Sequence, residues 1–198
     1  MTNQLKIILF ALLMGLMPLA FAQGGLEDFN LKRQQTSMAG MWTLGGWAAA
    51  NFVVGGIGWA RGSGSNMYFH QGNVLWNTVN AGIAGVALYS LYNADPGSLG
   101  LFESIKEHYG LEKTLLFNAG LDVGYMAAGF YLRERAKTAT KNQDMLKGYG
   151  SALILQGAFL FVFDLALYGI INQQSKQLEA LISPVYLTPE GFGMVLRF

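Results

Sequence analysis

Residues 148–171 read GYGSALILQGAFLFVFDLALYGII, and Asp164 is the only charged side chain among them. An α-helix rises about 1.5 Å per residue, so a helix of this length can span the hydrocarbon core of a lipid bilayer, which is about 30 Å thick. A bilayer core excludes charged groups and accepts apolar side chains all around a helix. The stretch therefore predicts a transmembrane helix.

Three further apolar stretches of similar length come earlier in the chain, at residues 38–60, 73–92 and 112–132. The chain is 52% hydrophobic and only 13% charged, and its mean hydropathy of +0.30 lies on the apolar side of an ordinary soluble domain. A soluble four-helix bundle would carry a polar face on each helix, yet Asn51 is the only strongly polar side chain in residues 48–59. We therefore expect an all-α protein, a transmembrane antiparallel four-helix bundle.

The first 22 residues have the features of a cleavable secretory signal. Lys6 follows a short polar start, residues 7–17 form an unbroken apolar run, and Ala20-Phe21-Ala22 places small residues at alternate positions. The predicted organisation is a signal peptide at residues 1–22, a four-helix transmembrane domain at residues 23–172 and a periplasmic tail at residues 173–198. The alternative is that the first segment remains attached as a fifth helix.

Loop charges predict which side of the membrane each connection faces. Residues 133–147 hold Arg133, Arg135, Lys137, Lys141 and Lys147 against Glu134 and Asp144, whereas residues 93–111 hold Asp95, Glu103 and Glu107 against Lys106. Positively charged loops remain in the cytoplasm, and residues 61–72 are expected to form a second cytoplasmic loop. This predicts a multi-pass protein of the bacterial inner membrane whose mature N- and C-termini both lie in the periplasm.

Charge, cysteine and histidine content exclude several classes of function. The formal net charge of +1, without a dense basic stripe, excludes a nucleic-acid partner. The absence of cysteine excludes disulfides, thiol catalysis and iron–sulfur clusters. His70 is expected in a cytoplasmic loop and His108 in the opposite, external hairpin, so they cannot ligate one haem, and neither has the spacing of a zinc site. We expect neither a cofactor nor a metal ion.

Small residues four positions apart predict where membrane helices approach one another closely. Gly120, Gly124 and Ala128 form such a ridge in the third apolar stretch. The pattern suits a seam within the bundle and contact with a second copy of the chain equally well.

Two aspartates lie within the apolar stretches at a similar depth. Asp122 is about 15 Å along a helix from Glu112, and Asp164 is about 12 Å from Asn172, near the same side of the membrane. Carboxyl groups at this depth turn inward, pair or hold a proton. Asparagine and glutamine side chains lie at the same depth as these aspartates or on the same helix faces. The predicted polar core consists of Asn51, Asn77, Asn80, Asn118, Asp122, Gln156 and Asp164. We expect it to form one network in which the aspartates share a proton.

Two short motifs resemble those of the intramembrane aspartyl proteases. Gly120-Leu121-Asp122 and Phe163-Asp164 place carboxyl groups on successive helices, as that family does to activate a water molecule. That family carries Tyr-Asp on the earlier helix, Gly-x-Gly-Asp on the later one and a Pro-Ala-Leu segment beyond. Here the order is reversed and the last element is absent. We therefore expect no enzymatic activity.

The C-terminal tail has a different pattern from the rest of the chain. Phe192, Met194, Leu196 and Phe198 are apolar residues at alternate positions. Alternation with a period of two is typical of an extended strand. We expect a short extended segment or hairpin between about residue 184 and residue 198.

On the pattern of its four apolar stretches, the chain resembles the small, uncharacterised polytopic membrane proteins common in bacteria. We expect a non-enzymatic scaffold or accessory subunit in which the polar core fixes helix pairing. The alternative is a small proton-linked carrier or channel that uses Asp122 and Asp164. The expected partners are the lipid bilayer and either a second copy of the chain or another membrane protein.

Overall fold

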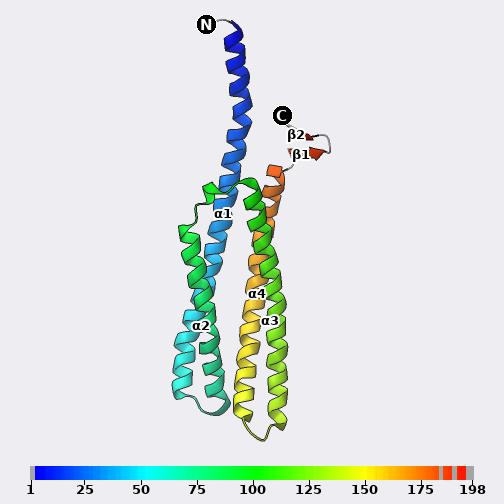
Figure 1. Ribbon diagram of the computed structural model, residues 1–198. Coiled ribbons are helices and arrows are strands. Elements are labelled where there is room, and N and C mark those ends of the chain that lie inside the picture. Colours follow the sequence, from blue (N-terminus) through cyan, green and yellow to red (C-terminus); the bar gives the residue numbers. More distant parts are fainter. Residues whose placement is uncertain (1–2, 183–184, 189–190, 195–198) are drawn as a thin grey trace.

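The computed structural model describes the backbone of residues 3–182, 185–188 and 191–194 and the side chains of residues 24–181. Four long helices form an antiparallel bundle: α1 (Asn3–Arg61), α2 (Gly64–Asn93), α3 (Leu101–Thr138) and α4 (Gln143–Ile182). In Figure 1, α1 extends well beyond the other helices at one end of the bundle. The four-helix bundle expected from the sequence is confirmed.

The two ends of the bundle contain different connections (Figure 1). The η1 end holds the 3-10 helix η1 (Pro96–Ser98), the start of α3 and the end of α4. At the opposite end, which we call the turn end, α1 connects to α2 and α3 connects to α4. Beyond α4, strands β1 (Val185–Thr188) and β2 (Gly191–Met194) pair as an antiparallel hairpin. This hairpin lies in the tail segment for which the sequence predicts an extended conformation.

The helices are longer than the apolar stretches that predict them. The expected loop at residues 61–72 is reduced to residues 62 and 63, and Gly64 takes a left-handed φ of 53° at the start of α2. Glycine adopts this conformation without a steric penalty. His70 therefore lies in α2, against Gly58 of α1, and the prediction that it lies in a loop is wrong. Hydropathy marks the apolar part of a helix, whereas the helix itself continues through polar residues such as Gln71.

The bundle consists of two helical hairpins that meet along α2 and α4. Helix α1 packs along α2, α3 packs along α4, and α2 also packs along α4. Among the described residues, the backbones of α2 and α3 do not approach each other closely.

Close contact between α3 and α4 is made by glycines other than the predicted ones. A Cβ atom at Gly120 or Gly124 would meet nothing within 4 Å, so of the two alternatives this ridge does not form a seam within the bundle. A Cβ atom at Gly129 would instead lie 2.6 Å from the carbonyl oxygen of Gly150 on α4. Spacing of small residues predicts that helices approach closely, but it does not predict which face makes the approach.

Gly129→Ala is expected to destabilise the bundle by about 1–3 kcal/mol, because the added methyl group meets the backbone of α4. Gly124→Ala is the matched control on the same helix, and it should leave stability unchanged or raise it slightly, since alanine favours the helix. Thermal unfolding in detergent, followed by circular dichroism, compares the two variants. Equal stability of both would contradict this packing of α3 on α4.

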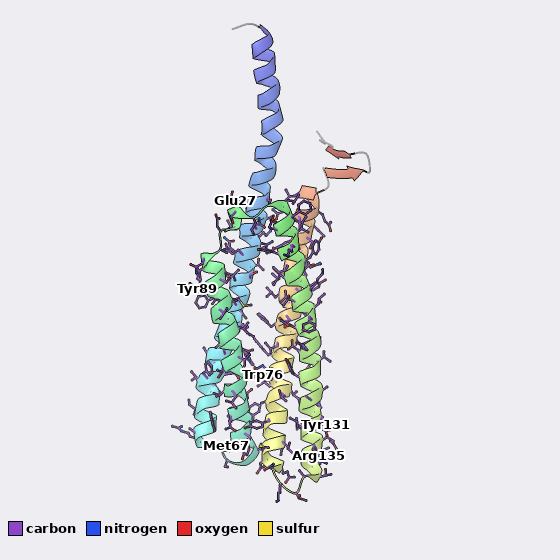
Figure 2. All side chains as sticks on the ribbon, in the orientation of Figure 1. Glu27, Met67, Trp76, Tyr89, Tyr131 and Arg135 are labelled. Atoms are coloured by element: carbon purple, nitrogen blue, oxygen red, sulfur yellow. The ribbon has the colours of Figure 1, made fainter. Side chains whose placement is uncertain are left out.

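The polarity of the bundle is the reverse of that of a water-soluble protein. Among the described side chains, buried polar and charged residues outnumber buried apolar ones. Large apolar side chains are instead exposed on every helix, for example Val54 (63% exposed), Val86 (73%), Phe117 (66%) and Val162 (66%). Tyr89 and Tyr131 likewise project away from the bundle in Figure 2. An extensive apolar surface of this kind marks contact with a membrane or with other proteins.

Two helices are long and apolar enough, by length and composition, to cross a membrane. These are α2 and residues 143–181 of α4. The described part of α1 and the whole of α3 fall short of the same criterion. Glycine is frequent in both, and Asn118 and Asp122 interrupt the apolar stretch of α3. The four stretches that look equivalent in the sequence therefore differ in apolar character.

Candidate functional site

Gln156 of α4 connects three helices inside the bundle. Its Nε2 atom donates to Asn51 Oδ1 of α1 at 3.2 Å and to Asn73 Oδ1 of α2 at 2.7 Å. Its Oε1 atom accepts a hydrogen bond of 2.9 Å from Trp47 Nε1. Gln156 is fully buried. A buried amide with both of its polar atoms satisfied fixes the register of the helices that it joins.

The asparagines of α2 extend this amide cluster towards the η1 end. Asn77 Nδ2 donates to the carbonyl oxygen of Asn73 at 2.8 Å, and Asn80 Nδ2 donates to Asn77 Oδ1 at 3.1 Å. All three side chains are buried. Their spacing of i, i+4 and i+7 places them on one face of α2, which is the face turned to the interior.

Asp122 of α3 and Asp164 of α4 are neighbours inside the bundle, close enough for their carboxyl groups to influence each other. Both are buried, with 2% and 5% of their surface exposed. Because an ionised carboxylate only accepts hydrogen bonds, a bond between two carboxyl groups requires a proton on one of them. One shared proton, as the sequence predicts, would leave the pair with a single negative charge. Asp122 Oδ2 has no hydrogen-bond partner among the described residues.

A cavity of about 290 Å³, lined by residues of all four helices, lies beside this acid pair. Its polar lining includes Asn80, Asn118, Asp122 and Asp164. Trp76 of α2 and Tyr125 of α3 also line it, with their ring centroids 4.7 Å apart in an edge-to-face arrangement. Much of the remaining wall is apolar, from residues such as Leu44, Ile83 and Leu160. The cavity thus combines a localised charge with an aromatic and aliphatic wall.

A second cavity, of about 540 Å³, lies at the η1 end and adjoins the first. Ser37, Met41 and Leu111 line both cavities. Arg33 and Glu107 also line the second one, and their side chains pair at 2.5 Å. These shared residues place the second cavity between the η1 end of the bundle and the first cavity.

The predicted core residues fall into two groups rather than one network. Asn51, Asn77, Asn80 and Gln156 belong to the amide cluster, and Asp122 and Asp164 form the acid pair. Asn118 is half-buried and lines the cavity, and within the described part of the chain no hydrogen bond to its side chain is found. Trp47 and Asn73 also belong to the amide cluster, although they were not among the predicted core residues.

Sequence reasoning missed a buried polar cluster near the η1 end. His108 Nε2 lies 2.8 Å from Ser175 Oγ, and Ser175 Oγ donates to Glu112 Oε1 at 3.1 Å. Since the serine proton is directed at Glu112, His108 Nε2 must carry a proton and donate to Ser175, which is the opposite of the activation of a serine nucleophile. His108 lies in α3 and is fully buried, so the prediction that it lies in an external hairpin is wrong.

The spacing of polar residues was the available signal for this cluster. Ser104, His108 and Glu112 follow one another at intervals of four, and Asp122 continues the same face of α3. Arg33 of α1 contacts this face, since its Nη1 atom donates to the carbonyl oxygen of Ser104 at 2.9 Å. Assigning residues 93–111 to a loop concealed the pattern, because helical periodicity has no meaning in a loop.

Burial lowers the pKa of His108, an effect that the Glu112 carboxylate opposes and Arg33 reinforces. Because the pKa is lower in the folded than in the unfolded state, the stabilising contribution of the neutral imidazole is complete above about pH 6.5 and is lost as the pH falls. The free energy of unfolding should decrease by up to about 1.4 kcal/mol per pH unit below that point. Thermal unfolding of the protein at a series of pH values measures this slope.

Two histidine variants identify the group that is responsible for this pH dependence. His108→Gln should remove most of it, whereas His70→Gln should retain it, because His70 lies near the opposite end of the bundle. The same slope in the wild-type protein and both variants would show that a different group titrates.

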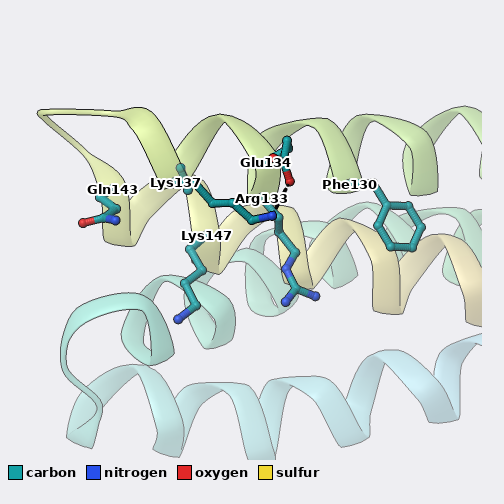
Figure 3. Close-up of a pocket in the computed structure, with 7 residues that line it drawn as sticks. Phe130, Arg133, Glu134, Lys137, Gln143 and Lys147 are labelled. Atoms are coloured by element: carbon teal, nitrogen blue, oxygen red, sulfur yellow. Dashed lines mark ion pairs between the residues drawn. The ribbon is translucent and has the colours of Figure 1, made fainter.

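A basic cleft lies beside the α3–α4 connection at the turn end. It has a volume of about 480 Å³ and is lined by Phe130, Arg133, Glu134, Ala136, Lys137, Gln143 and Lys147. Lys137 pairs with Glu134 at 2.6 Å, and Figure 3 shows Arg133 and Lys147 extending from α3 and α4 towards the same side. No group of three side chains that could hold a metal ion occurs within the described ranges.

These features define the chain as a helical bundle with an apolar surface and a polar core. It belongs to a family of unknown function, DUF6992, whose model matches residues 43–165. The matched range contains the amide cluster and the acid pair, but it excludes Arg33 and Ser175 of the cluster at the η1 end. No curated protein and no solved structure matches the chain. The expectation of an uncharacterised family is confirmed.

Proposed function

We propose that the chain is an integral membrane protein whose four helices all cross the lipid bilayer. The reversal of polarity between surface and core supports this proposal most directly. Val54, Val86 and Phe117 would be exposed to water in a soluble bundle, whereas in lipid they contact hydrocarbon at no cost. Helices α1 and α3 are less apolar because they contain polar side chains such as Asn51 and Asp122. In this proposal the two helices still cross the bilayer, since these side chains turn towards the other helices instead of towards lipid.

The charge distribution supports one orientation in the membrane. The basic cleft with Arg133 and Lys147 lies at the turn end, which we assign to the cytoplasm by the positive-inside rule. The η1 end and the mature termini then face the periplasm of a bacterial inner membrane. Residues 1–22 act in this proposal as a cleaved signal, and N-terminal sequencing of the mature protein should begin at Gln23.

Single cysteines introduced into this cysteine-free chain test the four spans and their orientation. A membrane-impermeant maleimide should label Ser98→Cys, between α2 and α3, from the periplasmic side of intact spheroplasts. It should label Thr140→Cys, between α3 and α4, only after the membrane has been permeabilised. Equal labelling at both positions before permeabilisation would rule out the proposed topology, and the absence of either protein from the membrane fraction would rule out a membrane protein.

Within this membrane protein, the acid pair best supports the role of a small proton-linked carrier. The observation behind this choice is Asp122 Oδ2, a buried oxygen without a hydrogen-bond partner, on a residue that lines a cavity. A buried acceptor without a partner destabilises the fold, so a purely structural core has no need of one. An acid pair that gains and loses a proton next to a cavity has the chemistry that proton-linked binding of a solute requires.

The second candidate is a scaffold or accessory subunit, and the amide cluster around Gln156 favours it. That cluster joins α1, α2 and α4 with all of its hydrogen bonds inside the bundle, which is what fixed helix pairing requires. The partner would be a second copy of the chain or another membrane protein. A scaffold would tolerate neutralisation of the acid pair with at most a change in stability, whereas a carrier would lose its activity.

A further inference from the structure

We infer that the cavity beside Asp122 and Asp164 binds a small monovalent organic cation with an aromatic or aliphatic body. This inference rests on the proposed carrier function and names the class of solute. The charge of the pair is its first support. The sequence predicts that the two carboxyl groups share one proton, and a pair in that state holds one negative charge, which disfavours anions and is matched by one positive charge.

The unpartnered oxygen of Asp122 provides a position for that positive charge. Asp122 is 2% exposed, and its Oδ2 atom accepts no hydrogen bond from the described residues. An ammonium or other cationic group beside it would supply the missing partner. The electrostatic attraction between a cation and a buried carboxylate is stronger than it is in water, because the surroundings screen it less.

The walls of the cavity favour an organic cation over a bare metal ion. Trp76 and Tyr125 line the cavity, and aromatic rings attract cations over their faces. The aliphatic residues around them would contact an apolar body. Metal ions need several oxygen or nitrogen ligands, and within the described ranges no group of three acidic or histidine side chains is placed to hold one. A volume of about 290 Å³ suits a solute of modest size.

The surroundings of the cavity differ between its two ends. The larger cavity at the η1 end adjoins it through the shared residues Ser37, Met41 and Leu111. Towards the turn end, Trp47 and Phe159 stack with their ring centroids 3.8 Å apart, and the amide cluster adjoins them. The described conformation therefore receives the cation from the η1 end.

Protons and cations compete for the charge of the acid pair. A second proton neutralises the pair, and a cation can then bind only if that proton leaves for the solvent. One positive charge is exchanged for another, so the charge of the site is conserved. Binding of a cation whose own charge is independent of pH should therefore weaken as the pH falls.

Benzyltrimethylammonium is a suitable probe, because its quaternary charge does not titrate. We expect radiolabelled probe to bind saturably to the full-length protein in phosphatidylcholine nanodiscs, and to bind about tenfold or more weakly in acid than in mildly alkaline solution. Asp122→Asn/Asp164→Asn should abolish binding. Asp144→Asn, at an exposed carboxyl group at the start of α4, is the matched control and should bind normally. Trp76→Leu should weaken binding roughly twofold to thirtyfold.

Three results would overturn the inference. They are failure of the wild-type protein to bind the probe, undiminished binding by the folded double variant, and equal competition by neopentylbenzene, the uncharged isostere. Infrared spectroscopy of the same nanodiscs separates this failure from failure of the proposed function. Suppose that the wild-type protein binds no probe and yet shows a protonated-carboxyl band that responds to pH and disappears in the double variant. That result would overturn only the inference that the cavity binds an organic cation. Absence of that band would also overturn the proton-linked carrier.

Discussion

Proteoliposomes that contain Asp122→Asn/Asp164→Asn are expected to show no proton movement in response to a gradient of benzyltrimethylammonium. With wild-type protein and the cation concentrated inside, each cation that leaves should be exchanged for an entering proton, so the lumen should acidify. Asparagine has the shape of a protonated aspartate but cannot ionise, so it offers neither a charge for the cation nor a site for the exchanged proton. A pH-sensitive dye trapped in the lumen measures the rate.

The loss of exchange must be separated from loss of folding. The double variant should keep the helical circular dichroism of the wild-type protein, because two amide side chains can still hydrogen-bond to each other across α3 and α4. Asp144→Asn should exchange protons at the wild-type rate, since Asp144 lies outside the cavity. If the folded double variant exchanged protons at the wild-type rate, a scaffold would be the better-supported function of this protein.

The sequence was sufficient to predict the helices and their antiparallel order. Long apolar stretches such as residues 148–171 leave few alternatives to a helix, and short connections between them impose antiparallel neighbours. The burial of Asp122, Asp164 and Gln156 could also be anticipated, because exposing a polar side chain of such a stretch to hydrocarbon is unfavourable. These inferences depend only on the local content of each segment.

The contacts between helices could not be predicted from a single segment. Gly129 and Gly120 look equivalent in the sequence, but only Gly129 meets the backbone of α4. The rotation of a helix about its own axis decides between them, and that rotation depends on every neighbour at once. The same reason explains why the hydrogen bond between Asn73 and Gln156, across 83 residues of sequence, could not be predicted.

The candidate site was only partly visible for a related reason. The acid pair follows from depth and periodicity, but the cavity beside it depends on how all four helices pack around it, which no sequence pattern reports. His108 was missed because its segment is too polar to be recognised as part of a long helix. Its burial comes from tertiary contacts with Phe29 and Ser175, from α1 and α4.

Gln156→Leu is expected to be the most destabilising single substitution in the core. Leucine has a similar volume, so little space is created, but three partners lose their hydrogen bonds: Trp47 Nε1, Asn51 Oδ1 and Asn73 Oδ1. A buried group left unpaired costs about 1–3 kcal/mol, which applies in full to Asn73 and in part to the half-buried Trp47 and Asn51, so the free energy of unfolding should fall by a few kcal/mol. Thermal unfolding in detergent should show this as a large decrease in Tm.

Two further variants test whether unpaired groups, rather than packing, cause that loss. Gln173→Leu makes the same change at an exposed position of α4 and should leave the Tm almost unchanged. Gln156→Leu/Asn73→Leu removes one of the stranded groups together with its partner, and it should therefore recover part of the stability lost in Gln156→Leu. If the double variant were less stable by the full sum of the two single losses, Gln156 and Asn73 would act independently and the amide cluster would not couple α2 to α4.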